Sequence, residues 1–227
     1  MKRQSPKLAL FEQFAQVAKT LGHAHRLDLV EHVAQGERSV ETLAQRTGLS
    51  IANASQHLQQ LRRAGLVTAR RDGKFVHYKL ADDAVLDLLA ALHAIAERNV
   101  AEVGNILRNY FHDRDSLEPV SRKELQQRLR NRSVTVLDVR PEDEFKLAHV
   151  PGALNIPLAA LKKRLSELDP AKEVVAYCRG PYCVLAFEAV ALLRRRGFNV
   201  RRLQDGIPEW RAAGLPVETG GVGQAGN

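Results

Sequence analysis

Residues 174–185, VVAYCRGPYCVL, hold both cysteines of this 227-residue chain, at positions 178 and 183. The apolar run VVAY is typical of a buried strand, and the apolar spacing after Cys183 is typical of a helix. The intervening RGPY contains a glycine and a proline, which favour a tight turn. The stretch therefore predicts a strand, a short loop and a helix, with one thiol at each end of the loop.

Backbone amides of such a loop and of the helix start converge on one point, where they stabilise an anion. A sulfur held there beside Arg179 is expected to be open to solvent and to have a pKa below that of free cysteine. We therefore predict that Cys178 is a reactive thiol and that Arg179 stabilises its anionic forms. Gly180 is expected to let the backbone turn. The remaining positions of the predicted site loop are Pro181, Tyr182, Cys183 and Val184.

Cys183 allows two interpretations. It is either a second thiol that attacks a persulfide on Cys178, giving a disulfide or a sulfur-bridged pair, or a small apolar residue at the start of a helix. Two thiols this close, in a chain without an export signal, favour redox or sulfur chemistry over a structural disulfide. Because two thiols are too few for a structural zinc site, we predict no metal and no cofactor.

Strands and helices alternate over residues 120–218, which indicates an α/β domain with a mostly parallel sheet. Strands are expected at 134–139, 173–178 and 199–206, and helices at 122–130, 158–168 and 184–197.

This half of the chain resembles the rhodanese family. LDVRPEDEFKLAHVPGALNIPL (137–158), the cysteine loop and LQDGIPEWRAAGLPV (203–217) match three family motifs in order. The resemblance implies that Cys178 is the sulfur-accepting nucleophile. It also implies structural or gating positions, which are Asp138, Arg140, Glu144 and His149.

The chain departs from the rhodanese pattern at two places. Asp205 stands where the family usually has the first of two glycines, a change that we expect to be harmless. Val184 and Leu185 stand where phosphatase-like loops carry a closing arginine, which disfavours phosphatase or arsenate-reductase chemistry.

The first half of the chain predicts a mainly helical domain with a small hairpin. Helices are expected at 8–20, 25–34, 40–48, 51–65 and 82–111. Two strand-like runs, 66–71 and 74–80, are separated by Asp72-Gly73, a tight-hairpin signal. A two-helix unit followed by a basic hairpin is the layout of a winged helix-turn-helix. The last predicted helix is longer than a small domain needs, so we expect a partner subunit to cover one of its faces.

The helix at 51–65 is the predicted recognition helix, because Ala54, Leu58 and Leu61 share one inward face. The other face carries short polar and amide side chains suited to reading base edges. Predicted base-proximal positions are Ala52, Asn53, Ser55, Gln56 and Gln59, and predicted phosphate or minor-groove positions are Arg62, Arg63, Arg70, Arg71 and Lys74.

GLSIANASQHLQQLRRAGLVTARRDGKFVHYKL (48–80) closely resembles ArsR-family repressors, and the resemblance extends over about residues 8–112. It implies a homodimer on palindromic double-stranded operator DNA, with the first and last helices forming the dimer face. This half has no cysteine, although many members sense metals through cysteines. One alternative is that His93 and Glu97 form half of a metal site between two subunits. Sensing by the second domain is the stronger hypothesis.

The charge and composition of the chain indicate its kind of partner and its compartment. The net charge of +8 favours a polyanionic partner, and residues 1–112 and 113–227 share it equally. No apolar run is long enough for a membrane helix and no signal peptide is recognisable, so we predict a cytoplasmic protein without membrane contact. The predicted division is a DNA-binding and dimerisation domain (1–112), a linker (113–119), a rhodanese-like domain (120–218) and a disordered tail (219–227).

The combined prediction is a DNA-binding repressor that senses sulfane sulfur, persulfide or thiol oxidation through Cys178, with a small sulfur donor or oxidant as effector. One alternative is a rhodanese-type sulfurtransferase tethered to a DNA-binding domain. Another is a sensor of arsenite or a metal.

Overall fold

The computed structural model describes residues 5–112 and 119–220 of the chain. It divides into two units, residues 1–87 and 88–227, so the division falls within helix α5 (Ala84–Asn99). Most of the linker expected at 113–119 lies outside the described residues. Among the described helices, none is long and apolar enough to span a bilayer.

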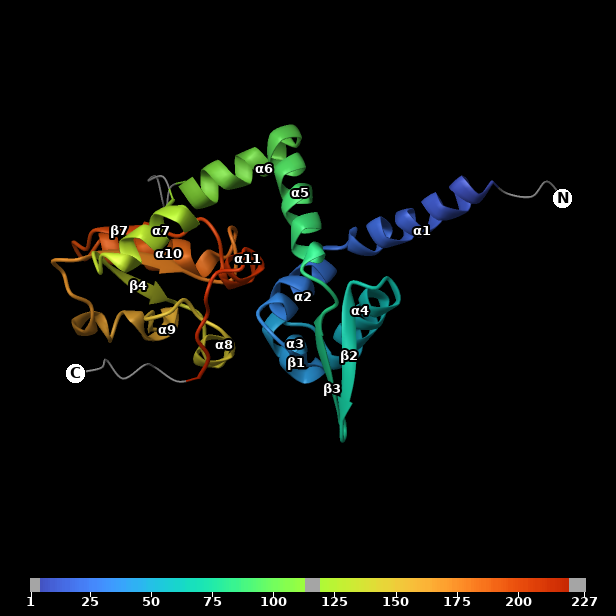
Figure 1. Cartoon of the computed structure of the whole chain (residues 1–227), viewed down its shortest axis with the longest axis horizontal. Helices are drawn as coiled ribbons and strands as arrows, with labels where there is room; N and C mark the ends of the chain where they lie inside the picture. Colours follow the sequence, from blue (N-terminus) through green and yellow to red (C-terminus); the bar gives the residue numbers. More distant parts are fainter. Residues whose placement is uncertain (1–4, 113–118, 221–227) are drawn as a thin grey trace. The chain divides into compact units, whose positions relative to one another are not determined.

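The first unit is a helical domain with a small antiparallel sheet of order β1-β3-β2 (Figure 1). Its elements are α1 (Pro6–Leu21), α2 (Ala24–Ala34), β1 (Arg38–Ser39), α3 (Val40–Thr47), α4 (Ile51–Arg63), β2 (Val67–Asp72) and β3 (Phe75–Leu80). This arrangement confirms the winged helix-turn-helix and adds the two-residue strand β1, which was not predicted.

Local capping defines the helix-turn-helix. The hydroxyl of Ser39 accepts the Thr42 N–H at the start of α3, and that of Ser50 accepts the Asn53 N–H at the start of α4. Gly48 ends α3 with a φ of 68°, a conformation that favours glycine. The inward face of α4 is fully buried at Ala54, Leu58 and Leu61, as predicted. These apolar contacts hold α4 against α2 and α3, so its opposite face is presented outward.

The prediction of one continuous helix over 82–111 is wrong. It is broken into α5 (Ala84–Asn99), α6 (Ala101–Ile106) and the π-helix η1 (Leu107–His112), with Val100 extended between α5 and α6. The Arg98 and Asn99 side chains donate to the carbonyls of Ala94 and Ile95, four residues earlier. Because they take acceptors from the last turn of α5, they favour its end at this point.

Helices α1 and α5 expose apolar faces. Phe14 on α1 is 57% exposed and Ile95 on α5 is 55% exposed. The other large apolar side chains exposed on these two helices are Leu8, Leu10, Phe11, Leu88 and Leu92. Faces of this kind on a folded domain mark an interaction surface.

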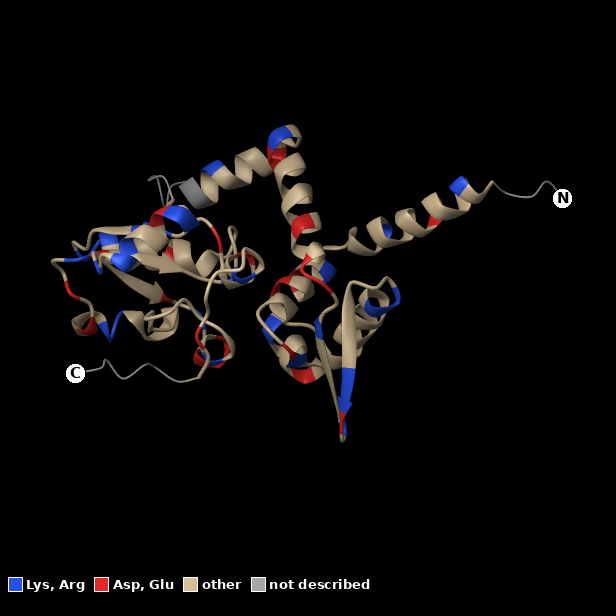
Figure 2. Cartoon of the chain, viewed as in Figure 1, with Lys and Arg blue, Asp and Glu red and all other residues tan. Residues whose placement is uncertain are grey.

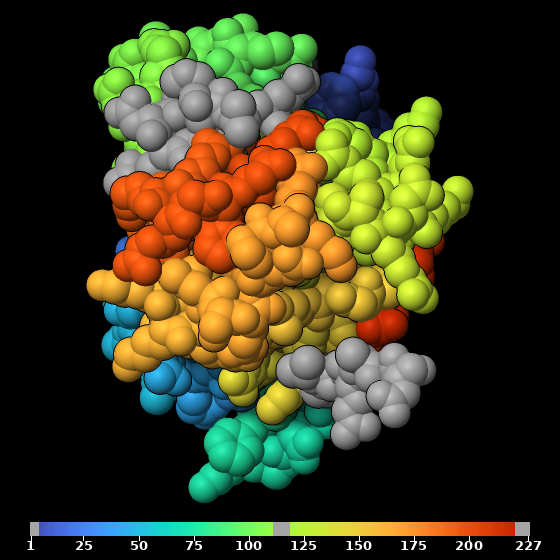
Figure 3. All heavy atoms as spheres, turned by 90° about the vertical axis from the view of Figure 1, so that its left-hand side faces the viewer, coloured from blue at the N-terminus to red at the C-terminus, as the bar shows by residue number. Residues whose placement is uncertain are grey.

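The second unit contains a four-stranded, fully parallel sheet of order β5-β4-β6-β7. After the end of α5, α6 and η1, its elements are α7 (Arg122–Arg130), β4 (Val134–Asp138), α8 (Glu142–Leu147), β5 (Leu154–Asn155), α9 (Leu158–Leu161), the 3-10 turn η2 (Leu165–Glu167), β6 (Glu173–Tyr177), α10 (Val184–Arg194), β7 (Val200–Arg202) and α11 (Ile207–Ala212). The predicted α/β class is confirmed, whereas the helix expected at 158–168 is reduced to α9 and η2. Glu124 of α7 pairs with Arg201 of β7 at 3.0 Å, where the two elements meet at the surface (Figure 3).

Strand β6 is buried on both faces, as expected of a central parallel strand. Val174 and Ala176 pack into one apolar layer, and Val175 and Tyr177 pack into the other. Cys178 continues the first set and lies in the layer formed with α10. The alternation of the strand therefore directs the Cys178 side chain toward the start of α10.

Candidate functional site

The cysteine loop joins the carboxyl end of β6 to the start of α10. Cys178 follows the last strand residue, and Cys183 is the N-cap of the helix. The Cys183 N–H donates to the Gly180 carbonyl at 3.2 Å and closes the turn. The predicted strand, loop and helix are confirmed, and both cysteines are free thiols.

The two thiols interact directly. The Cys178 thiol donates to the Cys183 carbonyl at 3.4 Å, with the Gly180 carbonyl at 4.0 Å. The side chains of the two cysteines also contact each other, and backbone N–H groups of Arg179 and Leu185 contact the Cys183 sulfur. Backbone N–H groups of Gly180 and Ala186 contact the Cys178 sulfur. The loop amides therefore hold two sulfurs, where the sequence led us to expect one.

The prediction that the Cys178 thiol is open to solvent and has a lowered pKa is wrong. Its side chain is 2% exposed, and burial together with the hydrogen bond to Cys183 raises its pKa well above the value of free cysteine. The pKa of Cys183 is instead lowered to about 6, first by the hydrogen bond from Cys178 and then by the Arg179 amide and guanidinium. The burial of the pair and the contact between the two thiols therefore shift their pKa values in opposite directions.

Arg179 is held by Glu144 rather than by the sulfurs. Its guanidinium donates to both carboxylate oxygens of Glu144 at 2.8–3.1 Å. Glu144 is buried on α8, so the pair ties this helix to the cysteine loop. The geometry makes Glu144 a positioning residue for Arg179.

Asp138 and Arg140 form an ion pair in the buried interior of the domain. Both side chains are 0% exposed, and Arg140 Nη2 lies 2.6 Å from Asp138 Oδ2 and 2.7 Å from the Ala148 carbonyl. The buried Tyr177 hydroxyl accepts the Val150 N–H at 3.1 Å. These bonds connect the end of β4 and the segment before β5 to strand β6, which directly precedes Cys178.

His149 also has structural contacts. Its ring stacks on Phe145 with 3.6 Å between the centroids, and Nδ1 hydrogen-bonds the Phe145 carbonyl at 2.8 Å. Its backbone exchanges two hydrogen bonds with Glu218. Gly220, which belongs to the expected tail, donates to the Lys146 carbonyl at 2.8 Å, whereas 221–227 lie outside the described residues.

The glycine that the loop requires is Gly206, which sequence reasoning missed. A Cβ at Gly206 would lie 2.1 Å from the Arg179 carbonyl oxygen and 2.6 Å from the Gly180 nitrogen. Gly180 itself has no positive φ, and a Cβ there would meet only Glu209 Oε1 at 3.8 Å. The backbone conformation at Gly180 therefore does not itself require a glycine. The Asp205-Gly206 pair was the available signal, because its glycine is the one that contacts the loop.

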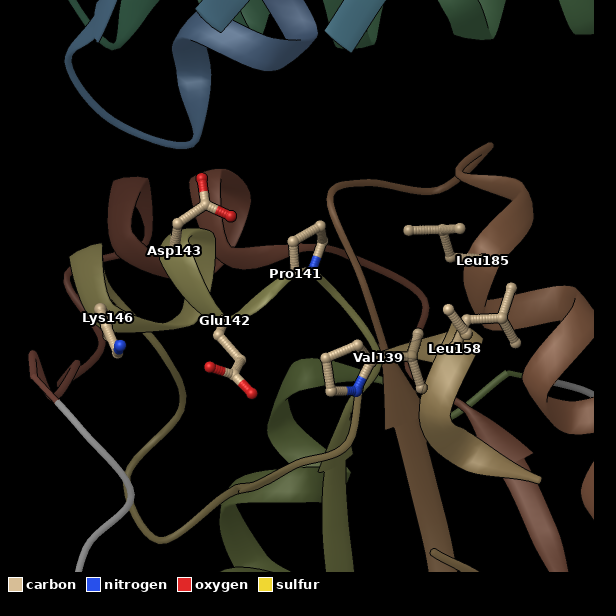
Figure 4. Close-up of a pocket in the computed structure, with 9 residues that line it drawn as sticks. Val139, Pro141, Glu142, Asp143, Lys146, Leu158 and Leu185 are labelled. Atoms are coloured by element: carbon tan, nitrogen blue, oxygen red, sulfur yellow. The ribbon is translucent and has the colours of Figure 1, made fainter. Parts of the chain in front are cut away.

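A groove of about 590 Å³ lies beside the loop (Figure 4). Val139, Pro141, Leu158 and Leu185 form apolar walls, and charged side chains line the remainder (Glu142, Asp143 and Lys146). Leu185 is in the first turn of α10, and its N–H is one of the two amides on the Cys183 sulfur. The groove thus extends to the helix turn that begins at Cys183.

The outward face of α4 and the hairpin carry the side chains predicted to contact DNA. Ser55 is partly exposed and the other nine predicted positions are exposed. Within this set, Gln59 Nε2 donates to Ser55 Oγ at 3.3 Å, and Arg70 pairs with Glu37 and Asp72 at 2.8 and 3.1 Å. Lys and Arg residues lie along the hairpin (Figure 2). The unit therefore presents a polar helix face and a basic wing, as expected.

Comparison with known proteins covers both units. Residues 21–70 match a helix-turn-helix domain family, and residues 121–213 match the rhodanese-like domain family. The HTH-type transcriptional regulator Rv0324 of Mycobacterium tuberculosis (strain ATCC 25618 / H37Rv) is 43% identical over 214 residues, which span 94% of each chain. The chain belongs to the ArsR-type transcriptional regulators with a C-terminal rhodanese domain.

Two further relatives each match one half of this regulator. A sulfurtransferase of Allochromatium vinosum is 32% identical over 100 residues, covering 43% of the regulator and 92% of that protein. The homodimeric winged helix-turn-helix domain Mb0332 of Mycobacterium bovis is 40% identical, covers 44% of the regulator and 94% of that chain, and has a TM-score of 0.40.

Proposed function

We propose that this transcriptional regulator is a repressor that leaves its operator when the cysteine loop reacts with sulfane sulfur, a persulfide or an oxidant. The observation that carries the proposal is the contact between two free thiols in a loop lined by backbone amides. Two neighbouring thiols are the groups that thiol–disulfide exchange requires.

The proposal is tested with operator DNA selected from a random duplex library by the full chain. Tetrasulfide is expected to weaken the affinity of the unsubstituted protein for this DNA by about tenfold or more, in the range of ordinary allosteric coupling. The double variant Cys178→Ser/Cys183→Ser should keep its affinity in tetrasulfide. An equal response of the double variant would refute sensing by the loop.

A sulfurtransferase is the second candidate, supported by the rhodanese match and the Allochromatium vinosum relative. The number of sulfur atoms that each chain transfers distinguishes this enzyme from the sensor. Steady production of thiocyanate from thiosulfate and cyanide would favour the enzyme, whereas a single modification per chain would favour the sensor. Arsenite or metal sensing has weaker support, because the described residues contain no group of three His, Cys, Asp or Glu arranged to hold a metal ion.

We further propose that the regulator reads DNA as a homodimer through α4 and the wing. The exposed apolar faces of α1 and α5 support dimerisation, as does the homodimer of the Mycobacterium bovis domain. A two-fold dimer presents two copies of α4, so the selected duplexes are expected to be inverted repeats.

Gln56→Ala and Arg71→Ala should separate base reading from phosphate binding. Gln56→Ala is expected to cost about 1–3 kcal/mol on the selected operator and to relax preference at one base pair, because amide side chains bind base edges. Arg71→Ala should weaken binding to all duplexes alike and reduce the salt slope by about 0.9 per lost phosphate contact. Fluorescence anisotropy at several salt concentrations measures both effects. Lys162→Ala, which removes one charge in the other unit, is the control. Equal loss on selected and random DNA would contradict base reading by Gln56.

A further inference from the structure

We propose that Tyr182 of the cysteine loop couples the chemical state of the loop to operator binding through helix α5. The contacts that carry the inference are those of Tyr182 with Glu97 and His93 on this helix. The inference rests on the proposed function of the loop as a sensor. It adds the path by which a change at the thiols reaches the elements that bind DNA.

Tyr182 contacts two residues of α5 that lie one helical turn apart. Its hydroxyl donates to Glu97 Oε1, and its ring meets the His93 imidazole edge-on, with 4.9 Å between the ring centroids. Burial, followed by the contact with Glu97, raises the pKa of the Tyr182 phenol, and burial lowers the pKa of His93. The phenol therefore keeps its proton at neutral pH and remains the donor to the Glu97 carboxylate.

The position of Tyr182 in the loop makes it sensitive to a change at either thiol. Tyr182 directly precedes Cys183, whose N–H closes the turn on the Gly180 carbonyl. Cys178 and Cys183 are buried, and backbone N–H groups of the loop and of the first turn of α10 contact their sulfurs. An added sulfur lengthens a cysteine side chain by about 2 Å. Because the surroundings are packed, the loop backbone must shift to accommodate it, and Tyr182 moves with the loop.

Helix α5 has the loop contact on one side and exposed apolar side chains on the other. Leu88, Leu92 and Ile95 are exposed and belong to the apolar face proposed for dimerisation. At about 100° per residue, His93 and Glu97 lie on the opposite side of the helix. The division between the two units falls within α5, so one continuous helix belongs to both. A shift at the loop contact therefore changes how α5 packs against a partner subunit, and with it the spacing of the two copies of α4.

Tetrasulfide adds a sulfur to the loop by a balanced transfer. After a loop thiol loses its proton to water, its thiolate attacks an end sulfur of the tetrasulfide dianion and forms a new S–S bond. The donor S–S bond beside that sulfur breaks, the trisulfide dianion leaves with the bonding electron pair, and the loop carries a persulfide. No further oxidant is needed, because the transferred sulfane sulfur is itself reduced as the thiolate is oxidised. The coupling is the same whichever cysteine accepts the sulfur.

Glu97→Ala and Tyr182→Phe each remove one partner of the hydrogen bond. The affinity of the unsubstituted full chain for the selected operator is expected to fall about tenfold or more in tetrasulfide. In Glu97→Ala the same treatment should lower the affinity by less than about threefold, because the loop no longer acts on α5. The number of sulfur atoms taken up per chain, measured by mass spectrometry, should equal that of the unsubstituted chain. Tyr182→Phe and the double variant should show the same reduced response, since both residues act through one contact.

Glu188→Ala is the matched control, because it removes an exposed carboxylate from α10 and should respond as the unsubstituted chain does. The fluorescence of the single tryptophan, Trp210, verifies folding of each variant. If Glu97→Ala responds as strongly as the unsubstituted chain, the sensor holds and the coupling through this contact is overturned. A smaller sulfur uptake in Glu97→Ala that accounts for its smaller response would overturn it as well. If the unsubstituted chain takes up sulfur without a change in operator affinity, or takes up none, the proposed function fails and the coupling fails with it.

Discussion

Gly206→Ala is expected to slow the reaction of the cysteine loop with thiol reagents by on the order of 100-fold. The added Cβ would lie 2.1 Å from the Arg179 carbonyl oxygen and 2.2 Å from its carbon, both in the backbone of the loop. No side-chain rotation relieves such an overlap, so either α11 or the loop must move, at a cost of about 3 kcal/mol. A displacement of about 1 Å at a reacting group can lower a rate on the order of 100-fold. The rate of alkylation of the two loop thiols at neutral pH measures the effect.

Gly180→Ala is the matched control because it adds the same methyl group to the same loop. Its Cβ would meet only Glu209 Oε1, at the ordinary contact distance of 3.8 Å. We expect Gly180→Ala to change the free energy of unfolding by less than about 1 kcal/mol. If Gly206→Ala and Gly180→Ala alkylate equally fast, the close approach of Gly206 does not position the loop.

Arg140→Met should unfold the rhodanese domain at much lower denaturant concentration. The substitution leaves the Asp138 carboxylate fully buried without its partner and leaves the Ala148 carbonyl without this donor. Breaking a buried ion pair in this way costs about 3–5 kcal/mol, because the remaining charge has lost its solvation and its partner. Trp210 is the single tryptophan of the chain and is buried in this domain, so its fluorescence reports this transition.

Arg164→Met is the matched control, because it removes the same type of pair at the surface. Arg164 and Glu167 contact at 2.6 Å, but their side chains are 33% and 40% exposed. An exposed pair of this kind contributes about 0–1 kcal/mol. The double variant Asp138→Leu/Arg140→Met should recover part of the loss, because no buried charge remains. A loss below about 1 kcal/mol in Arg140→Met would show that the buried pair contributes little.

Local chemistry allowed most of the fold to be predicted. Ser39 and Ser50 were recognised as helix caps, Gly48 as a helix end and Asp72-Gly73 as a hairpin turn, because each acts on residues only two to four positions away. The buried face of α4 was predicted from the helical spacing of its apolar residues. Where side chains compete for backbone carbonyls, as Arg98 and Asn99 do at the end of α5, apolar periodicity alone predicted a helix that was too long.

The sequence by itself determined that this chain joins a winged helix-turn-helix to a rhodanese domain, and that two thiols flank one tight loop. Only the tertiary structure decided that backbone amides contact both sulfurs and that burial raises the pKa of Cys178. It also decided that Gly206, which lies 28 positions after Cys178, limits the path of the loop. Both depend on contacts within a few ångströms between atoms that spacing along the chain does not bring together.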